Sequence, residues 1–308
     1  MSQTVQIEGV SRAVHRLAEE FAPVRLRIHW WGSQKTLDDA QKTRAAETFQ
    51  AKADFLSASK RLINTKDESY KKLTTVKNAA RKYWQSQTLP YPEDGVRLIR
   101  LDDVADFDQH MESVAAELRG NVIDLDVQMP RLIEDARERL GSLFNAAEYP
   151  MTFNGLFNID WEYPNLNPPE YMKTINPGIY EQECARIRNR FSEAVELAEE
   201  AFLEQFVGIV DRLRDRMLPN EDGTVKRFND ATVEDAFVDF FERFGRLNVG
   251  SSEELERAVE EAREVLNGVT PSGLRNSADQ REHVLNGMNA VREGLDELIS
   301  SGPRRLLG

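Results

Sequence analysis

The chain has 308 residues, of which 40 % are hydrophobic and 30 % charged, and its formal net charge is -13. This composition is typical of a folded, helix-rich protein and excludes an intrinsically disordered one. No run approaches the roughly 18 apolar residues of a transmembrane helix, and the sequence begins with charged residues where a signal peptide needs an apolar stretch, so we expect a cytoplasmic protein.

Charge is unevenly distributed along the chain. Residues 1–92 carry 16 Lys and Arg against 9 Asp and Glu, a net charge of +7, and the remaining residues carry a net charge of -20. Opposite charges attract over about a Debye length. We therefore expect the two regions to attract each other, within one molecule or between copies of it.

The first part of the chain predicts a short helix over 4–21 and then a strand over 24–31. Val24, Leu26, Ile28 and Trp30 alternate with polar or outward positions, which is the period of a strand with one buried face. Two further segments, 95–101 and 153–164, have the same apolar pattern. The sequence therefore predicts a small β-sheet of about three short strands.

Residues 38–86 predict one long helix. Apolar or aromatic residues recur there at seven-residue spacing, which indicates a coiled-coil-like seam: Phe49, Leu56, Ile63, Tyr70 and Trp84. At about 1.5 Å per residue, the helix would be roughly 70 Å long. A second helical stretch follows over 103–147, where Gly120 and Pro130 should bend or break the helix. A short connection favours an antiparallel return of the two stretches as a helical hairpin.

Prolines at 164, 168, 169 and 177 mark a connector, since proline interrupts helices. We therefore divide the chain into 1–163, a helical hairpin with a small sheet; 164–178, a proline-rich connector; and 179–308, a C-terminal helical region. Helices are expected over 179–218, 231–246, 251–268 and 277–299. The predicted fold class is mainly α, with a long antiparallel helical hairpin or bundle and the small sheet.

Motifs that would indicate catalysis, a cofactor or a metal are missing from the sequence. No glycine-rich phosphate loop follows a predicted strand, and the four histidines lack the spacing of a zinc site. The single cysteine, Cys184, cannot form an internal disulfide, which fits a reducing compartment. An acidic group could hold Ca²⁺, but it lacks the glycine and final glutamate of an EF-hand, and a helix start explains it better: Asp102, Asp103, Asp106 and Asp108. We expect no enzyme, cofactor or metal.

A basic stripe over 60–82 is the first candidate binding site. It consists of Lys60, Arg61, Lys66, Lys71, Lys72, Lys77, Arg81 and Lys82, and Tyr70, Tyr83 and Trp84 lie among these residues. Cations that neutralise phosphates and rings that stack on bases are typical of single-stranded nucleic-acid binding. Alternatively, the stripe contacts carboxylates, either of a partner or of the second helical stretch. The acidic residues of that stretch are Asp102, Asp103, Asp106, Asp108, Glu112, Glu117, Asp124 and Asp126.

A phenylalanine stripe in the C-terminal region is the second candidate. Phe237, Phe240, Phe241 and Phe244 are spaced at i, i+3, i+4 and i+7, so they share one face of a helix. Such a face forms the core of a helical bundle. The alternative is a helix that docks into the groove of a partner protein.

The order of "RLRIHWWGSQKTL", a long helix, "PYPEDGVRLI", a second long helix and "FNGLFNIDWEYPNLNPPEYM" resembles an uncharacterised family of bacterial and phage proteins. Members are often encoded near MoxR-type AAA+ ATPases and von Willebrand A-domain proteins. The resemblance covers about residues 24–218. It implies a helical component of a multi-protein assembly, with an AAA+ ATPase as a candidate partner and a phage or mobile element as a candidate origin.

Together these features predict a non-enzymatic structural or scaffold protein. It would self-assemble or dock into a larger assembly through long helical seams and surfaces of complementary charge, because contacts between different surfaces of identical subunits build rings or filaments. The alternative is a single-stranded nucleic-acid-binding protein that uses the basic stripe. A metal-dependent enzyme built from distant residues is a third hypothesis.

Overall fold

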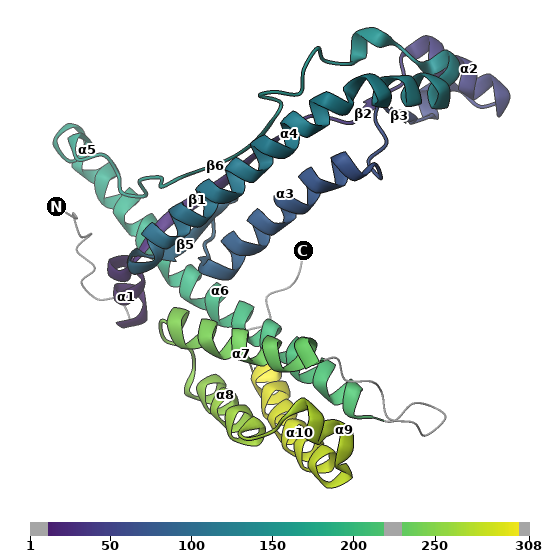
Figure 1. Ribbon diagram of the computed structural model, residues 1–308. Coiled ribbons are helices and arrows are strands. Elements are labelled where there is room, and N and C mark those ends of the chain that lie inside the picture. The colour runs from purple at the N-terminus through teal and green to yellow at the C-terminus, as the bar shows by residue number, and fades with distance from the viewer. Residues whose placement is uncertain (1–11, 219–229, 302–308) are drawn as a thin grey trace. The chain divides into compact units, whose positions relative to one another are not determined.

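The computed structural model describes residues 12–218 and 230–301. Within these residues it contains ten α-helices and a four-stranded antiparallel sheet, so the predicted mainly α fold is confirmed (Figure 1). In the described part of the chain, no helix is long and apolar enough to cross a membrane. The principal elements are α1 (Arg12–Glu20), β1 (Phe21–Trp30), β2 (Gln34–Thr36), α2 (Asp39–Thr48), β3 (Ser59–Arg61), α3 (Glu68–Gln87), β4 (Thr88–Pro90), β5 (Val96–Arg100), α4 (Val104–Leu140), β6 (Phe157–Glu162), α5 (Tyr171–Ile175), α6 (Pro177–Met217), α7 (Asp230–Leu247), α8 (Glu253–Leu266), α9 (Pro271–Asn276) and α10 (Ala278–Ser301).

The chain forms two compact units, and neither is continuous in sequence. Unit 1 comprises Met1–Pro23, Gln87–Leu101 and Asn165–Gly308, and unit 2 comprises Val24–Ser86 and Asp102–Pro164. The second segment of unit 2 ends at Pro164, and the chain continues in unit 1 from Asn165. This crossing lies one residue from the boundary between 163 and 164 that the sequence predicted. The sequence-based division assigned 12–23 and 87–101 to the first domain, whereas here they belong to the same unit as the C-terminal helices.

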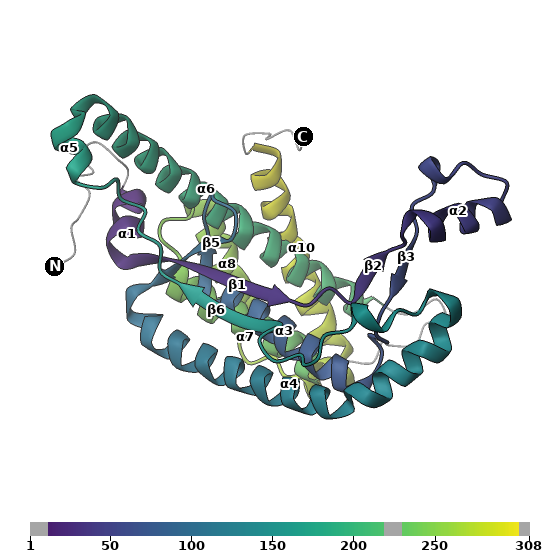
Figure 2. The ribbon, with the colours of Figure 1, turned by 90° about the horizontal axis from the view of Figure 1, so that it is seen from above.

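The strands of the main sheet are ordered β4-β5-β1-β6. β1 and β6 lie side by side and antiparallel, with Ile28 opposite Ile159 and Trp30 opposite Phe157 (Figure 2). The predicted strands over 24–31, 95–101 and 153–164 are confirmed as β1, β5 and β6. The sequence did not predict β4 or the separate β2–β3 pair, because three residues are too few to show an alternating pattern.

In unit 2, α3 and α4 run side by side in opposite directions (Figure 1). Asp67, just before α3, contacts Arg131 near the end of α4, whereas Tyr83 near the end of α3 stacks on His110 near the start of α4, with 3.6 Å between the ring centroids. The predicted antiparallel return of the two helical stretches is therefore confirmed.

The prediction of one long helix over 38–86 is wrong. α2 begins at a capping box formed by Asp38 and Gln41 and ends at Thr48, and Gln50 then adopts a positive φ of 52°. A short 3-10 helix, Ala53–Phe55, and strand β3 occupy the middle of the predicted seam. Phe49 is 75 % exposed, so the seven-residue spacing across this stretch does not correspond to a buried seam. The long helix of this stretch is α3, which buries four residues.

Of the bend or break expected at Gly120 and Pro130, the break does not occur. α4 runs without interruption over 37 residues and contains both of them. Both residues lie on the exposed side of the helix. A proline inside a helix costs about 3 kcal/mol, and ten buried side chains on the opposite face of α4 offset this cost.

Unit 1 is built on α6, which has 41 residues. Asn176 caps its first turn by accepting a hydrogen bond from the Ile179 amide, and Pro177 occupies the start of the helix, where no amide donor is needed. Aromatic residues of α6 pack against α7, and polar contacts join α6 to α10: Arg214 donates to Asn289 at 2.7 Å, and Arg292 donates to Asp211 at 3.0 Å. One apolar core runs through these helices.

Candidate protein interaction surfaces

Four cations of the predicted basic stripe share the outer face of α3. The inner face of α3 buries Tyr70, Leu73, Val76 and Ala80. On the opposite face lie four exposed cations, called here the α3 basic face: Lys71, Lys72, Arg81 and Lys82. Lys71 and Lys82 are eleven residues apart, about three turns or roughly 16 Å along the helix. The structure thus brings these four residues together as a linear surface.

The aromatic residues of α3 do not belong to this face. Tyr70 is 5 % exposed, and its hydroxyl accepts a hydrogen bond of 3.2 Å from the Trp30 indole. Tyr83 stacks on His110, and Trp84 is half-buried. Single-stranded nucleic acid is usually held by exposed rings as well as cations, so the α3 basic face lacks one part of that combination.

Two other members of the predicted stripe have structural roles. Lys60 is buried; its ammonium donates to the Leu143 carbonyl at 2.6 Å and lies 2.8 Å from a carboxylate oxygen of Glu148. The assignment of Lys60 to a binding surface is therefore wrong. Lys77 lies over the Trp30 ring at 4.5 Å, and burial, with a smaller contribution from the nearby Arg81 charge, lowers its pKa. Arg61 and Lys66 are exposed but precede α3.

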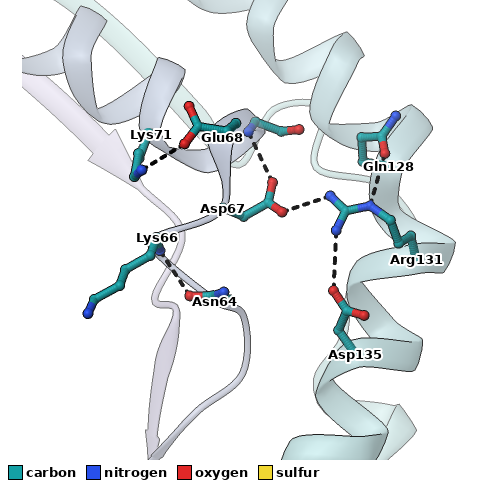
Figure 3. Close-up of polar contacts among 9 residues, drawn as sticks. Asn64, Lys66, Asp67, Glu68, Lys71, Gln128, Arg131 and Asp135 are labelled. Carbon is teal, nitrogen blue, oxygen red and sulfur yellow. Dashed lines mark hydrogen bonds and ion pairs between the residues drawn. The ribbon is translucent and has the colours of Figure 1, made fainter.

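The expected contact between the basic stripe and the acidic residues of the second helix is also wrong. Where α3 meets α4, the charges are the opposite of those expected. The carboxylate comes from Asp67, just before α3, and the cation from Arg131 of α4, and they form an ion pair of 2.8 Å (Figure 3). Lys71 pairs with Glu68, one turn earlier on its own helix, at 2.7 Å. Lys72, Arg81 and Lys82 make no ion pair with any described residue. The α3 basic face is therefore largely available to a partner.

Asp67 positions the start of α3. One carboxylate oxygen accepts a hydrogen bond of 3.0 Å from the Ser69 amide, and the other accepts one of 2.8 Å from Arg131. Burial favours the neutral acid, but the bonds from Arg131 and Ser69 outweigh burial and lower the pKa of Asp67. Arg131 is held from its other side by Gln128 and Asp135 (Figure 3). The contact fixes α3 against α4 within unit 2.

The phenylalanine stripe is part of the core of unit 1. Phe237, Phe240 and Phe244 are at most 5 % exposed, and Phe241 is half-buried. Phe240 stacks on Phe206 of α6, with 4.9 Å between the centroids. The face is therefore covered by the same chain, and the alternative of a free partner-docking helix at these residues is wrong.

An open groove of about 770 Å³ lies between α4 and β6 in unit 2. Two carboxylates of α4 hold the ends of the β6 segment: Asp126 accepts from the Phe153 amide at 2.6 Å, and Asp108 accepts from the Tyr163 hydroxyl at 2.8 Å and from the Trp161 indole. Between these contacts the groove is lined by Gln109, Glu112, Ser113, Ala115, Ala116, Arg119, Asn158, Ile159, Asp160 and Trp161.

An acidic surface lies on α8 in unit 1. Six glutamates of this helix are exposed, and Arg257 and Arg263 are its only cations. Glu256 accepts a hydrogen bond from Asn248, and Glu260 lies 3.7 Å from Arg263. The others, called here the α8 acidic face, make no ion pair with any described residue: Glu253, Glu254, Glu261 and Glu264.

Across residues 12–218 and 230–301, no group of three or more His, Cys, Asp or Glu side chains could hold a metal ion. In the acidic sequence before and within α4, Asp106 lies in the first turn of the helix, where a carboxylate meets the positive end of the helix dipole.

In comparisons with protein-family models, curated proteins and solved structures, nothing matches this chain.

Proposed function

We propose that this protein is a non-enzymatic, self-assembling scaffold in which the α3 basic face of one copy binds the α8 acidic face of another. The observation that carries the proposal is the orientation of α3. Its outer face presents four exposed cations, while its aromatic residues pack inward. A surface of cations without exposed rings favours binding to carboxylates over stacking on bases.

The two faces are complementary in charge and in length. The α3 basic face extends for roughly 16 Å. Glu253 and Glu264 on α8 are likewise eleven positions apart, which gives the same length at about 1.5 Å per residue. The two faces differ, so the contact is heterologous. Each copy carries both faces, so repetition of the contact generates a ring or an open filament.

The test is the mass in solution, measured by light scattering at low and high salt. Exposed ion pairs weaken as the Debye length falls from about 10 Å at 0.1 M salt to about 3 Å at 1 M. We expect oligomers at low salt and monomers at high salt. A strict monomer under both conditions, at about 0.5 mM protein, would overturn the proposal.

A pair of charge-reversed variants identifies the surfaces. The first replaces Lys71, Lys72, Arg81 and Lys82 with Glu, and the second replaces Glu253, Glu254, Glu261 and Glu264 with Lys. Each variant alone should be monomeric at low salt, because its two faces carry the same sign. An equimolar mixture should assemble again, since each face of one variant is complementary to a face of the other. Failure of the mixture to assemble would assign the contact to other surfaces.

Single-stranded nucleic acid is the competing ligand, because the α3 basic face still offers several cations to phosphates. An oligothymidylate added to the wild-type protein tests it. Salt-sensitive binding that is lost in the Glu variant of α3, with no self-association, would favour this function.

The resemblance to proteins encoded near AAA+ ATPases adds such an ATPase as a candidate partner of the assembly. We also propose that the assembly is located in the cytoplasm.

A further inference from the structure

The two outer strands of the main sheet differ in how their free edges are protected. β4 has three residues, includes Pro90, which has no amide donor, and has its Thr88 carbonyl occupied by Arg97 and Arg243. β6 has six residues and pairs with β1 on one side only. No described residue outside β1 is hydrogen-bonded to the β6 backbone. An open strand edge of this kind is a template for another strand.

The groove beside this edge has room for the side chains of an added strand. The wall formed by α4 includes Ala115 and Ala116, whose small side chains leave the space next to Ile159 and Trp161 unfilled. Asp108 and Asp126 fix α4 against both ends of the β6 segment. These residues are eighteen positions apart on α4, about 27 Å, so the edge between them is held in place before any ligand binds.

Charge on the edge strand selects the kind of ligand. Asp160 lies opposite Arg27 in the β1–β6 register, but the Arg27 guanidinium forms its ion pair with Glu162, and so does that of Arg25. Asp160 is left exposed without an ion pair to any described residue, and so is Glu112 on the α4 wall. The groove lining therefore presents two carboxylates against one guanidinium, Arg119.

We propose that the open edge of β6 and the groove beside α4 bind an extended basic peptide of a partner protein, which adds a strand to the sheet. Main-chain hydrogen bonds to β6 supply affinity, and alternate side chains supply specificity. Apolar side chains of the peptide point toward Ala115 and Ala116, and a Lys or Arg on the opposite face of the peptide pairs with Asp160. At about 3.3 Å per residue, β6 accommodates roughly six residues.

A second copy of β6 is a poorer occupant than a basic peptide. Asp160 and Glu162 lie on the same face of the strand and no cation of β6 accompanies them. Antiparallel pairing of two β6 edges would bring acidic faces together, and like charges opposite each other destabilise a strand pair. The site is independent of the proposed α3–α8 contact, which involves neither β6 nor α4.

The experiment measures binding of labelled peptides to the full chain by fluorescence anisotropy. The probe is an amidated hexapeptide of alternating Val and Lys. One control peptide has Glu in place of Lys, and another has the Val-Lys sequence with alternate amides N-methylated. We expect saturable binding of the Val-Lys peptide and at least about tenfold weaker binding of both controls, a difference of about 1.4 kcal/mol in each case.

Substitutions in the protein locate the site. Asp160→Lys should reverse the preference toward the Glu peptide, and Ala116→Trp, which fills the groove, should weaken binding at least about tenfold. Asp124→Lys makes the same charge change on an exposed part of α4 outside the groove, and it should leave binding unchanged, as should the four α3 substitutions. Equal effects of Asp160→Lys and Asp124→Lys, undiminished binding of the N-methylated peptide, or no binding at about 1 mM would overturn the inference.

Discussion

Removal of the Glu148 carboxylate is the most demanding test of the packing at the β3 end of unit 2. The side chains of Lys60 and Glu148 are 2 % and 11 % exposed, and their charged atoms lie 2.8 Å apart. At that distance, with an effective dielectric constant of about 20, their attraction is roughly 6 kcal/mol. Removing one partner of a buried pair typically costs about 3–5 kcal/mol, because the remaining charge is buried without compensation.

The expected result for Glu148→Ala is a fall of about 3–5 kcal/mol in the free energy of local opening of β3. Hydrogen exchange followed by mass spectrometry measures this opening for one segment, which matters because a chain with two compact units need not unfold in one step. The amides of β3, which pair with β2, provide the readout. In this variant the Lys60 ammonium still donates its hydrogen bond to the Leu143 carbonyl. The stability that is lost therefore comes chiefly from the electrostatic attraction between Lys60 and Glu148.

A double-mutant cycle separates charge from packing. Lys60→Met combined with Glu148→Leu removes both charges and keeps apolar volume, and replacement of a buried pair in this way is often neutral. We expect the double variant to be more stable than Glu148→Ala. A cost below about 1 kcal/mol for Glu148→Ala would contradict a strong attraction between Lys60 and Glu148. So would a double variant that is destabilised by the sum of its single changes.

Two further predictions concern the contacts that hold each unit. The pKa of Asp67 is lowered in the folded chain, so its contribution to stability is complete above its unfolded pKa of about 3.9 and is lost as pH falls through the lower folded value. Asp67→Asn preserves the cap but removes the charge. The difference in unfolding free energy between wild type and this variant should be constant above about pH 5 and shrink as pH falls below about 3.9. A difference that does not change with pH would contradict the assignment. In unit 1, Phe240 is fully buried against Phe206, so Phe240→Ala should lower the free energy of denaturant unfolding by about 3–5 kcal/mol. Val238 is 47 % exposed on the same helix, so Val238→Ala should change this free energy by no more than about 0.5 kcal/mol. Similar losses for both variants would show that α7 does not pack as described.

Local patterns in the sequence were sufficient wherever a whole element repeats one period. The helical stretch expected over 103–147 corresponds to α4, and the phenylalanine stripe corresponds to the buried face of α7. On the side of β1 predicted to face the core, Val24 is buried and Leu26, Ile28 and Trp30 are half-buried. These features depend on residues close together in the chain, so their spacing alone carries the information.

Local patterns gave wrong predictions for Lys60 and for the stretch from Phe49 to Ile63. Lys60 is charged and lies among other cations, and nothing near it in sequence indicates that Glu148 and the Leu143 carbonyl will enclose its ammonium. Its partners are more than 80 residues away. The seven-residue spacing from Phe49 likewise does not mark a buried helix face, because Phe49 is exposed and the positive φ of Gln50 ends the helix there.

The amino-acid order thus sufficed for the helical class, for most helix and strand positions and for the excess of cations near α3. The groove beside β6, the free state of Asp160 and the inward orientation of the α3 aromatics arose from long-range packing. Each depends on where α4 lies against β6 and α3 within unit 2, and that placement results from contacts such as those of Asp108, Asp126 and Arg131. Contacts between residues far apart in the chain leave no periodic trace in the sequence, because burial of one side chain depends on the shape of everything packed around it.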